Sequence, residues 1–220
     1  MKTLLRNRHH DSDPVWHAQL AMLAAIGLQL SLPDRFVLGS RYFIVAIELL
    51  LLAALSFTTP KEPIFRSLGR RINVVLLLVL ASLVNCYGLV RVAQQLLESG
   101  HISNGKELII TAVNIYLTNI IIFGLMYWEM DGGGPGQRAK IAKHEHDFLF
   151  PQDADEAYKS PHWLPTFVDY LYVSATNGMA FSPTDTMPLS RRAKMLMLAQ
   201  ATISLIAVAL VAARAVNILS

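Results

Sequence analysis

The stretch that decides the fold is LIITAVNIYLTNIIIFGLMYW, residues 108–128, which carries no charged side chain. An α-helix rises about 1.5 Å per residue, so roughly 20 apolar residues cross the hydrocarbon core of a membrane. In lipid every backbone polar group needs a partner within the segment, and a helix supplies one to each group. This stretch therefore predicts a transmembrane helix.

Four further apolar stretches lie on either side of it, and the first of them is short and weak. They run from about residue 16 to 32, from 36 or 42 to 57, from 72 to 97 and from 193 to 219. The composition agrees, since 53% of residues are hydrophobic and only 16% are charged, against about 25% charged in a soluble domain. We therefore predict an all-α integral membrane protein with about five transmembrane helices. The same composition excludes a disordered chain and argues against a soluble enzyme.

The positions of the basic residues indicate how the chain is oriented. Most Lys and Arg residues fall in the polar N-terminal tail (1–15), between the second and third stretches, and between the fourth and fifth. Positive charge marks the cytoplasmic side of a membrane. We therefore expect a multi-pass protein of the inner membrane with its N-terminus in the cytoplasm. Residues 16–100 form a three-helix membrane unit in this prediction, and residues 107–220 form a second unit.

The connection between the fourth and fifth stretches is long, whereas the other loops are short. After a helix expected over residues 107–130, residues 131–160 form a polar loop. Residues 164–176 are typical of an amphipathic helix too short to cross a membrane. Residues 177–190 follow as an irregular Gly- and Pro-marked stretch that is not expected to be helical, and residues 191–219 form the last helix. This order indicates a re-entrant pore-type helix and loop; the alternative is a long loop with a docked amphipathic helix.

The second unit, from about Leu108 to Ser220, resembles the pore-loop domain of tetrameric potassium and cation channels. The matching features are an aromatic-rich short helix, the triplet Thr176-Asn177-Gly178, the residues Asp185, Pro188 and Ser190, and a basic entry to the last helix. The unit is also similar to a family of uncharacterised bacterial multi-span membrane proteins. The resemblance implies a homo-oligomer, with a tetramer favoured. The channels' filter sequence Thr-Val-Gly-Tyr-Gly is degenerate here, so the resemblance does not extend to potassium selectivity.

The resemblance also implies which residues form the constriction. The filter-like residues are Thr176, Asn177, Gly178, Met179, Ala180, Phe181, Ser182 and Asp185. Since apolar constrictions close by losing water, Met179 and Phe181 are compatible with a hydrophobic gate.

Polar residues inside the expected spans form two helical stripes. The candidates for lining a water-filled path are Asn114, Thr118 and Glu129 in the fourth stretch and Gln200, Ser204 and Arg214 in the fifth. The alternative is hydrogen bonding between helices, because such side chains also hold helices together in lipid.

Two charged residues, Glu48 and Arg91, are expected at membrane depth. Buried charges in a membrane are costly and suggest either pairing or function. We predict an ion pair between them, with a permeation role as the alternative.

These observations predict passive permeation of cations or small solutes through an oligomeric, channel-like pore embedded in membrane lipid. One alternative is a secondary transporter that uses the intramembrane Glu and Arg charges. The other is a non-conducting structural membrane protein.

Enzyme, phosphate-loop and dinucleotide motifs are absent from the sequence, so we expect no catalysis and no cofactor. Neither of the His-rich segments, near residues 9–13 and 144–147, has the spacing of a structural zinc site. Basic loops are explained by topology, so no nucleic-acid partner is expected.

Overall fold

The computed structural model describes residues 16–57, 68–97, 105–135, 137–138, 145–154, 163–179 and 185–219. Helices dominate this part of the chain. The helical elements are α1 (Trp16–Leu30), η1 (Asp34–Phe36), α2 (Arg41–Phe57), α3 (Leu68–Leu97), α4 (Gly105–Met130), η2 (Asp131–Gly133), α5 (Pro151–Ala154), α6 (Phe167–Met179) and α7 (Arg191–Leu219). Two short strands, β1 (Phe148–Leu149) and β2 (Met187–Pro188), pair antiparallel.

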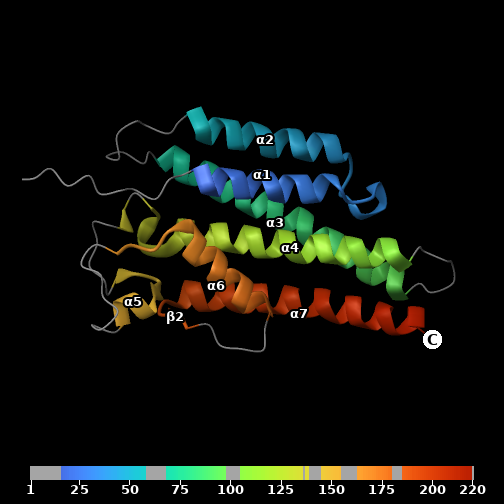
Figure 1. Cartoon of the computed structure of the whole chain (residues 1–220). Coiled ribbons are helices and arrows are strands. Elements are labelled where there is room, and N and C mark those ends of the chain that lie inside the picture. Colours follow the sequence, from blue (N-terminus) through green and yellow to red (C-terminus); the bar gives the residue numbers. More distant parts are fainter. Residues whose placement is uncertain are drawn as a thin grey trace, which may run out of the picture.

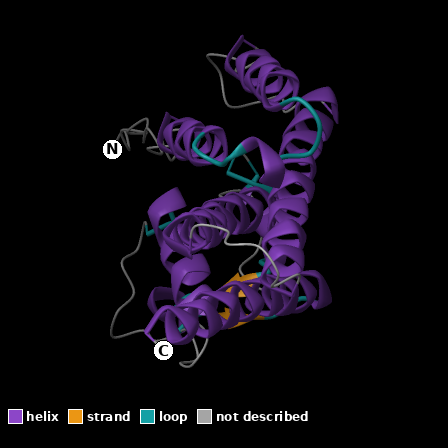
Figure 2. Ribbon diagram, turned by 90° about the vertical axis from the view of Figure 1, so that its right-hand side faces the viewer, coloured by secondary structure: helices purple, strands orange, loops and turns teal. Residues whose placement is uncertain are grey.

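The long helices run up and down as an elongated bundle with α4 at its centre (Figure 1). Helix α4 packs against α1, α3, α6 and α7. One end of the bundle holds the start of α3, the end of α4, the start of α7 and the paired strands, which are orange in Figure 2. We call this the Asp131 end, after the residue that follows α4. The basic loops predicted to share one side of the membrane adjoin helix ends that lie here.

Three described helices are long and apolar enough to cross a membrane: Ile72–Leu96, Gly105–Gly133 and Arg191–Ala213. They agree with the prediction of an all-α membrane protein. Helices α1 and α2 contain 15 and 17 residues, which at about 1.5 Å per residue is shorter than the roughly 30 Å hydrocarbon core. Five crossings therefore stays a prediction.

Helix α7 presents a broad apolar surface to its surroundings. Only 17% of its candidate span is buried, against 61% for the span that contains α4. The side chains of Met195, Leu198 and Leu205 are all more than half exposed. Such a face suits contact with lipid or with another helix.

Helix α6 begins later and ends later than the sequence indicated. It covers Phe167–Met179 instead of residues 164–176. At its start the Asp169 carboxylate accepts hydrogen bonds from the Thr166 backbone N–H, at 2.7 Å, and from the Thr166 hydroxyl, at 2.9 Å. This cap satisfies a free N–H before the first turn. The prediction that the non-helical stretch begins at residue 177 is wrong, because Asn177, Gly178 and Met179 complete the last turn of α6.

Helix α6 also runs inward from the Asp131 end. Its first ring, Phe167, contacts Trp128 in the last turn of α4, with ring centroids 6.2 Å apart. Its last turn lies beside Ile120 and Ser204, and Ser204 is about 20 Å along α7 from Arg191 at 1.5 Å per residue. The chain is back at the Asp131 end by residue 187, where Met187 pairs with Leu149.

Candidate functional site

A network of polar side chains joins α4, α6 and α7 halfway along the bundle. Its centre is Gln200, whose side chain is fully buried. The Gln200 Oε1 atom accepts hydrogen bonds from Asn177 Nδ2, at 2.9 Å, and from the Tyr127 hydroxyl. The Gln200 Nε2 atom donates to the Ser174 carbonyl at 2.8 Å and to its hydroxyl oxygen at 2.7 Å. The Gln200 side chain on α7 is therefore hydrogen-bonded to two residues of α6 and to one residue of α4.

Further bonds extend this network to the backbone. The Ser174 hydroxyl donates to the Ile120 carbonyl at 2.6 Å, and Asn177 Nδ2 donates to the Met197 carbonyl at 3.0 Å. On the α4 side, Asn119 Nδ2 donates to the Ser204 hydroxyl at 3.0 Å. Buried polar groups in an apolar surrounding are costly unless they are paired, so this network specifies the position of α6.

The pore-lining candidates on α7 belong to this network. The side chains of Gln200 and Ser204 have no exposed surface, and their described partners lie within the same chain. Their geometry is that of hydrogen bonds between helices, the alternative left open above. Arg214 lies in α7, but its side chain is outside the described residues.

The candidates on α4 point to other neighbours. Asn114 Nδ2 donates to the Ser31 hydroxyl, just after α1, at 2.7 Å. Thr118 is buried, and Glu129, also buried, lines a cavity beside α1, α2 and α3. The stripe predicted on α4 is therefore divided between different contacts.

The filter-like residues do not share one environment. Asn177 and Gly178 face the network. The Thr176 hydroxyl donates to its own helix, at the Tyr172 and Val173 carbonyls, while the Met179 side chain is 63% exposed. Asp185 is exposed. Ala180, Phe181 and Ser182 lie outside the described residues.

Glu48 and Arg91 have different partners from the one predicted. Glu48 is fully buried, and both of its carboxylate oxygens face the Gln29 amide. In the amide orientation that satisfies both groups, Gln29 donates to them at 2.8 and 3.1 Å. Arg91 instead donates to the Gln94 side chain at 2.9 Å and to the Arg35 carbonyl at 3.4 Å.

A second buried cluster, at the Asp131 end, was missed from the sequence. The Asp131 carboxylate has no exposed surface. It accepts hydrogen bonds from the backbone N–H groups of Asp147, at 2.6 Å, and Phe148, at 3.3 Å, and from the Tyr170 hydroxyl. His146 Nδ1 lies 3.7 Å from the same carboxylate. Asp131 thus joins the end of α4 to β1 and to α6.

Arg138 is the cation of this cluster. Its Nε atom lies 3.6 Å from Asp131, and its other nitrogens donate to the carbonyls of Pro165, at 3.1 Å, and Trp128. The guanidinium also stacks over the Tyr170 ring, 4.6 Å from its centroid. Burial raises the pKa of Tyr170 well above its ordinary value. The phenol therefore stays protonated and serves as a donor to Asp131.

The glycines after α4 allow this arrangement. Gly132, Gly133 and Gly134 all have positive φ angles, of 59°, 77° and 92°, which residues with a Cβ resist. From the sequence these glycines were expected only at the start of the polar loop, residues 131–160. An aspartate directly after an apolar helix, followed by glycines and then an arginine, was the available signal.

Among the described residues no group of three or more His, Cys, Asp or Glu side chains is placed to hold a metal ion. Compared with known proteins, the chain matches no family model, no curated protein and no solved structure.

Proposed function

We propose that the chain is a channel-like membrane protein that mediates passive permeation of cations or small solutes through an oligomeric pore. In this proposal α6 is a re-entrant pore helix, and α4 and α7 are the outer and inner helices. The observation that carries the proposal is the depth of α6. Its last turn lies beside Ser204, about 20 Å along α7, and the chain then returns to the end from which it entered.

The direction of α6 supports a preference for cations. The backbone dipoles of a helix place partial negative charge at its C-terminus. In α6 that terminus is Met179, beside residues halfway along α4 and α7. A cation near this point would gain favourable electrostatic energy, and the gain is larger away from bulk water.

The proposed path runs between copies of the chain, along the outer side of α6 and α7. Gln200 and Ser204 are engaged within one chain, so they support the pore helix instead of lining the path. Met179 on α6 and Thr202 on α7 are exposed. In this proposal they line the path in place of Gln200 and Ser204. The resemblance to tetrameric channels suggests four copies.

Cysteine accessibility at Met179 tests this proposal. Met179→Cys is made in a Cys86→Ala background, because Cys86 is the one cysteine in the chain, and the protein is reconstituted in liposomes. We expect a cationic, membrane-impermeant thiol reagent to label residue 179 and to reduce cation flux. A water-filled path exposes this position, whereas lipid would protect it.

The matched control is Leu83→Cys in the same background. Leu83 is 62% exposed on α3, and we expect it to face lipid and to stay unlabelled. Absence of flux in the unmodified protein, or a Met179→Cys protein that resists the reagent as Leu83→Cys does, would contradict the proposal. A monomeric particle without conductance would instead favour the structural alternative.

A further inference from the structure

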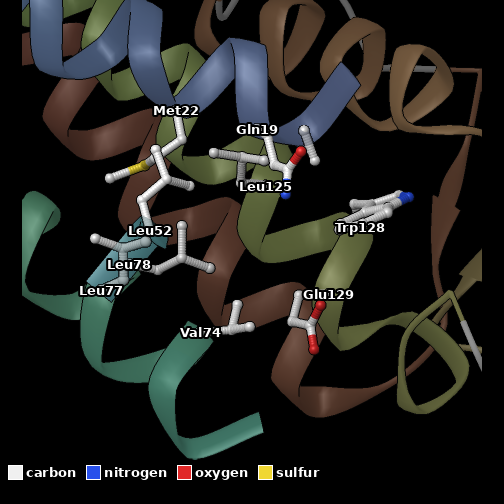
Figure 3. Close-up of a pocket in the computed structure, with 10 residues that line it drawn as sticks. Gln19, Met22, Leu52, Val74, Leu77, Leu78, Leu125, Trp128 and Glu129 are labelled. Atoms are coloured by element: carbon white, nitrogen blue, oxygen red, sulfur yellow. The ribbon is translucent and has the colours of Figure 1, made fainter. Parts of the chain in front are cut away.

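Glu48 lies halfway along α2, which packs against α1 and α3. Its side chain has no exposed surface. Val45 and Leu52, about one turn before and after it on the same helix, are also buried. Leu52 stands beside Met22 of α1 and Leu78 of α3 (Figure 3). The carboxyl group of Glu48 is therefore held in an apolar surrounding, away from water.

The partner of this carboxyl group in the described part of the chain is the Gln29 amide of α1. One amide atom of Gln29 stands 2.8 and 3.1 Å from the two Glu48 oxygens. An ionised Glu48 requires that atom to be Nε2, which then donates to both oxygens. A protonated Glu48 also allows it to be Oε1, which accepts the Glu48 O–H, while Gln29 Nε2 donates to the Ala81 carbonyl of α3 at 3.4 Å. The protonated form thus connects α2 to α3 through α1.

The charged and titratable residues of the three helices stand away from Glu48 along the helix axes. On α1, His17 is about 18 Å from Gln29, and on α3 the arginines nearest to Ala81 are about 15 Å from it. Arg41 begins α2, about 10 Å before Glu48. The full set is His17 of α1, Arg41 and Tyr42 of α2, and Arg70, Arg71, Cys86, Tyr87 and Arg91 of α3. Among the described side chains, none forms an ion pair with Glu48.

A neutral amide does not balance a buried negative charge. Removing an ionised carboxylate from water costs far more than one hydrogen bond returns, so a carboxyl group in such a site keeps its proton. Glu129 of α4 lies across the cavity that Leu52 lines (Figure 3), and a second negative charge there would add to the cost. We propose that Glu48 is a proton-binding site, which is occupied in the folded protein at neutral pH and whose proton holds α2 against α1. This inference is independent of permeation.

Helix α2 is the element that responds when the proton leaves. Transfer of the proton to bulk water leaves a buried carboxylate without a cation. Helix α2 lies at the edge of the bundle (Figure 1) and packs against α1 and α3, so it can move outward while α4 keeps its place. This movement brings the Glu48 carboxylate to water. Occupancy of the proton site therefore sets the position of α2.

Infrared spectroscopy of the protein in liposomes detects the proton directly, because the C=O stretch of a carboxylic acid is separate from the bands of a carboxylate. At neutral pH we expect a carboxylic acid band in the wild type and a loss equal to one proton per chain in Glu48→Gln. Glutamine is neutral and nearly the same shape, so this variant keeps the contact with Gln29. The control is Glu107→Gln, because Glu107 is in a part-exposed ion pair with Arg35, and the band should persist there. A wild type without the band, or an unchanged band in Glu48→Gln, would overturn the proposal.

A distance measurement tests the effect on α2. Spin labels are attached to Leu23→Cys of α1 and Leu49→Cys of α2, in the Cys86→Ala background, since both leucines are exposed. We expect the distance between the labels to lengthen at the alkaline pH at which the infrared band disappears, and to stay constant in Glu48→Gln. The control pair, Leu23→Cys with Leu117→Cys of α4, should keep its distance. An α1–α2 distance that does not change when the band disappears, or that lengthens equally in Glu48→Gln, would refute the coupling of the proton to α2.

Discussion

Gly178 of α6 lies directly against Ser204 of α7. A Cβ atom built on Gly178 would be 3.3 Å from the Ser204 hydroxyl oxygen and 3.4 Å from the Ile120 side chain. A Cβ at these distances requires the neighbouring side chains to shift by a few tenths of an ångström, and a larger side chain requires more. The glycine therefore lets α6 approach both neighbours closely enough for the hydrogen bonds of Gln200 to form.

We expect Gly178→Val to destabilise the protein. Inserting carbon atoms into a packed contact costs about 1–3 kcal/mol, and the displaced α6 would also lengthen the Asn177–Gln200 bond. The free energy of unfolding, measured by titration with a denaturing detergent, reports this loss. In the control, Gly27→Val, a Cβ has no neighbour within 4 Å; an equal loss there would contradict the packing argument.

Replacing Gln200 by leucine removes the centre of the network. The buried Tyr127 and Ser174 side chains and the half-buried Asn177 amide would each lose a partner, and an unsatisfied buried group costs about 1–3 kcal/mol. We expect a decrease in unfolding free energy in that range. The control is Thr202→Val, because Thr202 is exposed and its hydroxyl bonds to the Leu198 carbonyl of its own helix. Similar losses in the two variants would mean that the network does not hold α6.

Two arginines at the Asp131 end should differ sharply in their contribution to stability. Arg138 is 3% exposed, so Arg138→Ala leaves Asp131 buried without its cation, a change that costs about 3–5 kcal/mol. Arg192 lies 3.5 Å from Asp147 but its side chain is 69% exposed, and an exposed pair contributes about 0–1 kcal/mol. Arg192→Ala is therefore the matched control. Thermal unfolding of both variants checks the order, and a larger loss for Arg192→Ala would refute it.

Glu48 and Arg91 should be energetically independent. Glu48 contacts Gln29, and Arg91 contacts Gln94 and the Arg35 carbonyl. In a double-mutant cycle of Glu48→Gln and Arg91→Gln, we expect the two effects to add within about 0.5 kcal/mol. The Glu48–Gln29 pair serves as the positive comparison and should show coupling. A coupling above 1 kcal/mol between Glu48 and Arg91 would restore the predicted ion pair.

The long helices could be predicted because their signal is local. The apolar runs behind α3, α4 and α7 need only a count of residues and the thickness of a membrane. The polar positions Gln200 and Ser204 were also visible as a stripe on one helix face. The pattern does not identify the element that packs against this face of α7, which in the structure is the last turn of α6.

The Asp131 cluster could not be predicted for a different reason. Its members come from the end of α4, the segments around Arg138 and His146, and the first turn of α6. Their meeting depends on the three positive φ angles after α4 and on the pairing of Phe148 with Pro188. No periodic pattern encodes such a long-range contact. For Glu48, charge complementarity with Arg91 was a reasonable guide, but an amide partner on α1 satisfies the carboxylate instead.

The dependence of α6 on Gln200 has a consequence for biosynthesis. A ribosome completes α6 before it makes α7, so Ser174 and Asn177 emerge without the glutamine that satisfies them. Buried polar groups need partners, and α6 therefore reaches its final position only once α7 stands beside it. Helix α7, which is translated after α6, acts as the template on which α6 docks, and a nascent chain stopped before residue 200 would leave α6 unassembled.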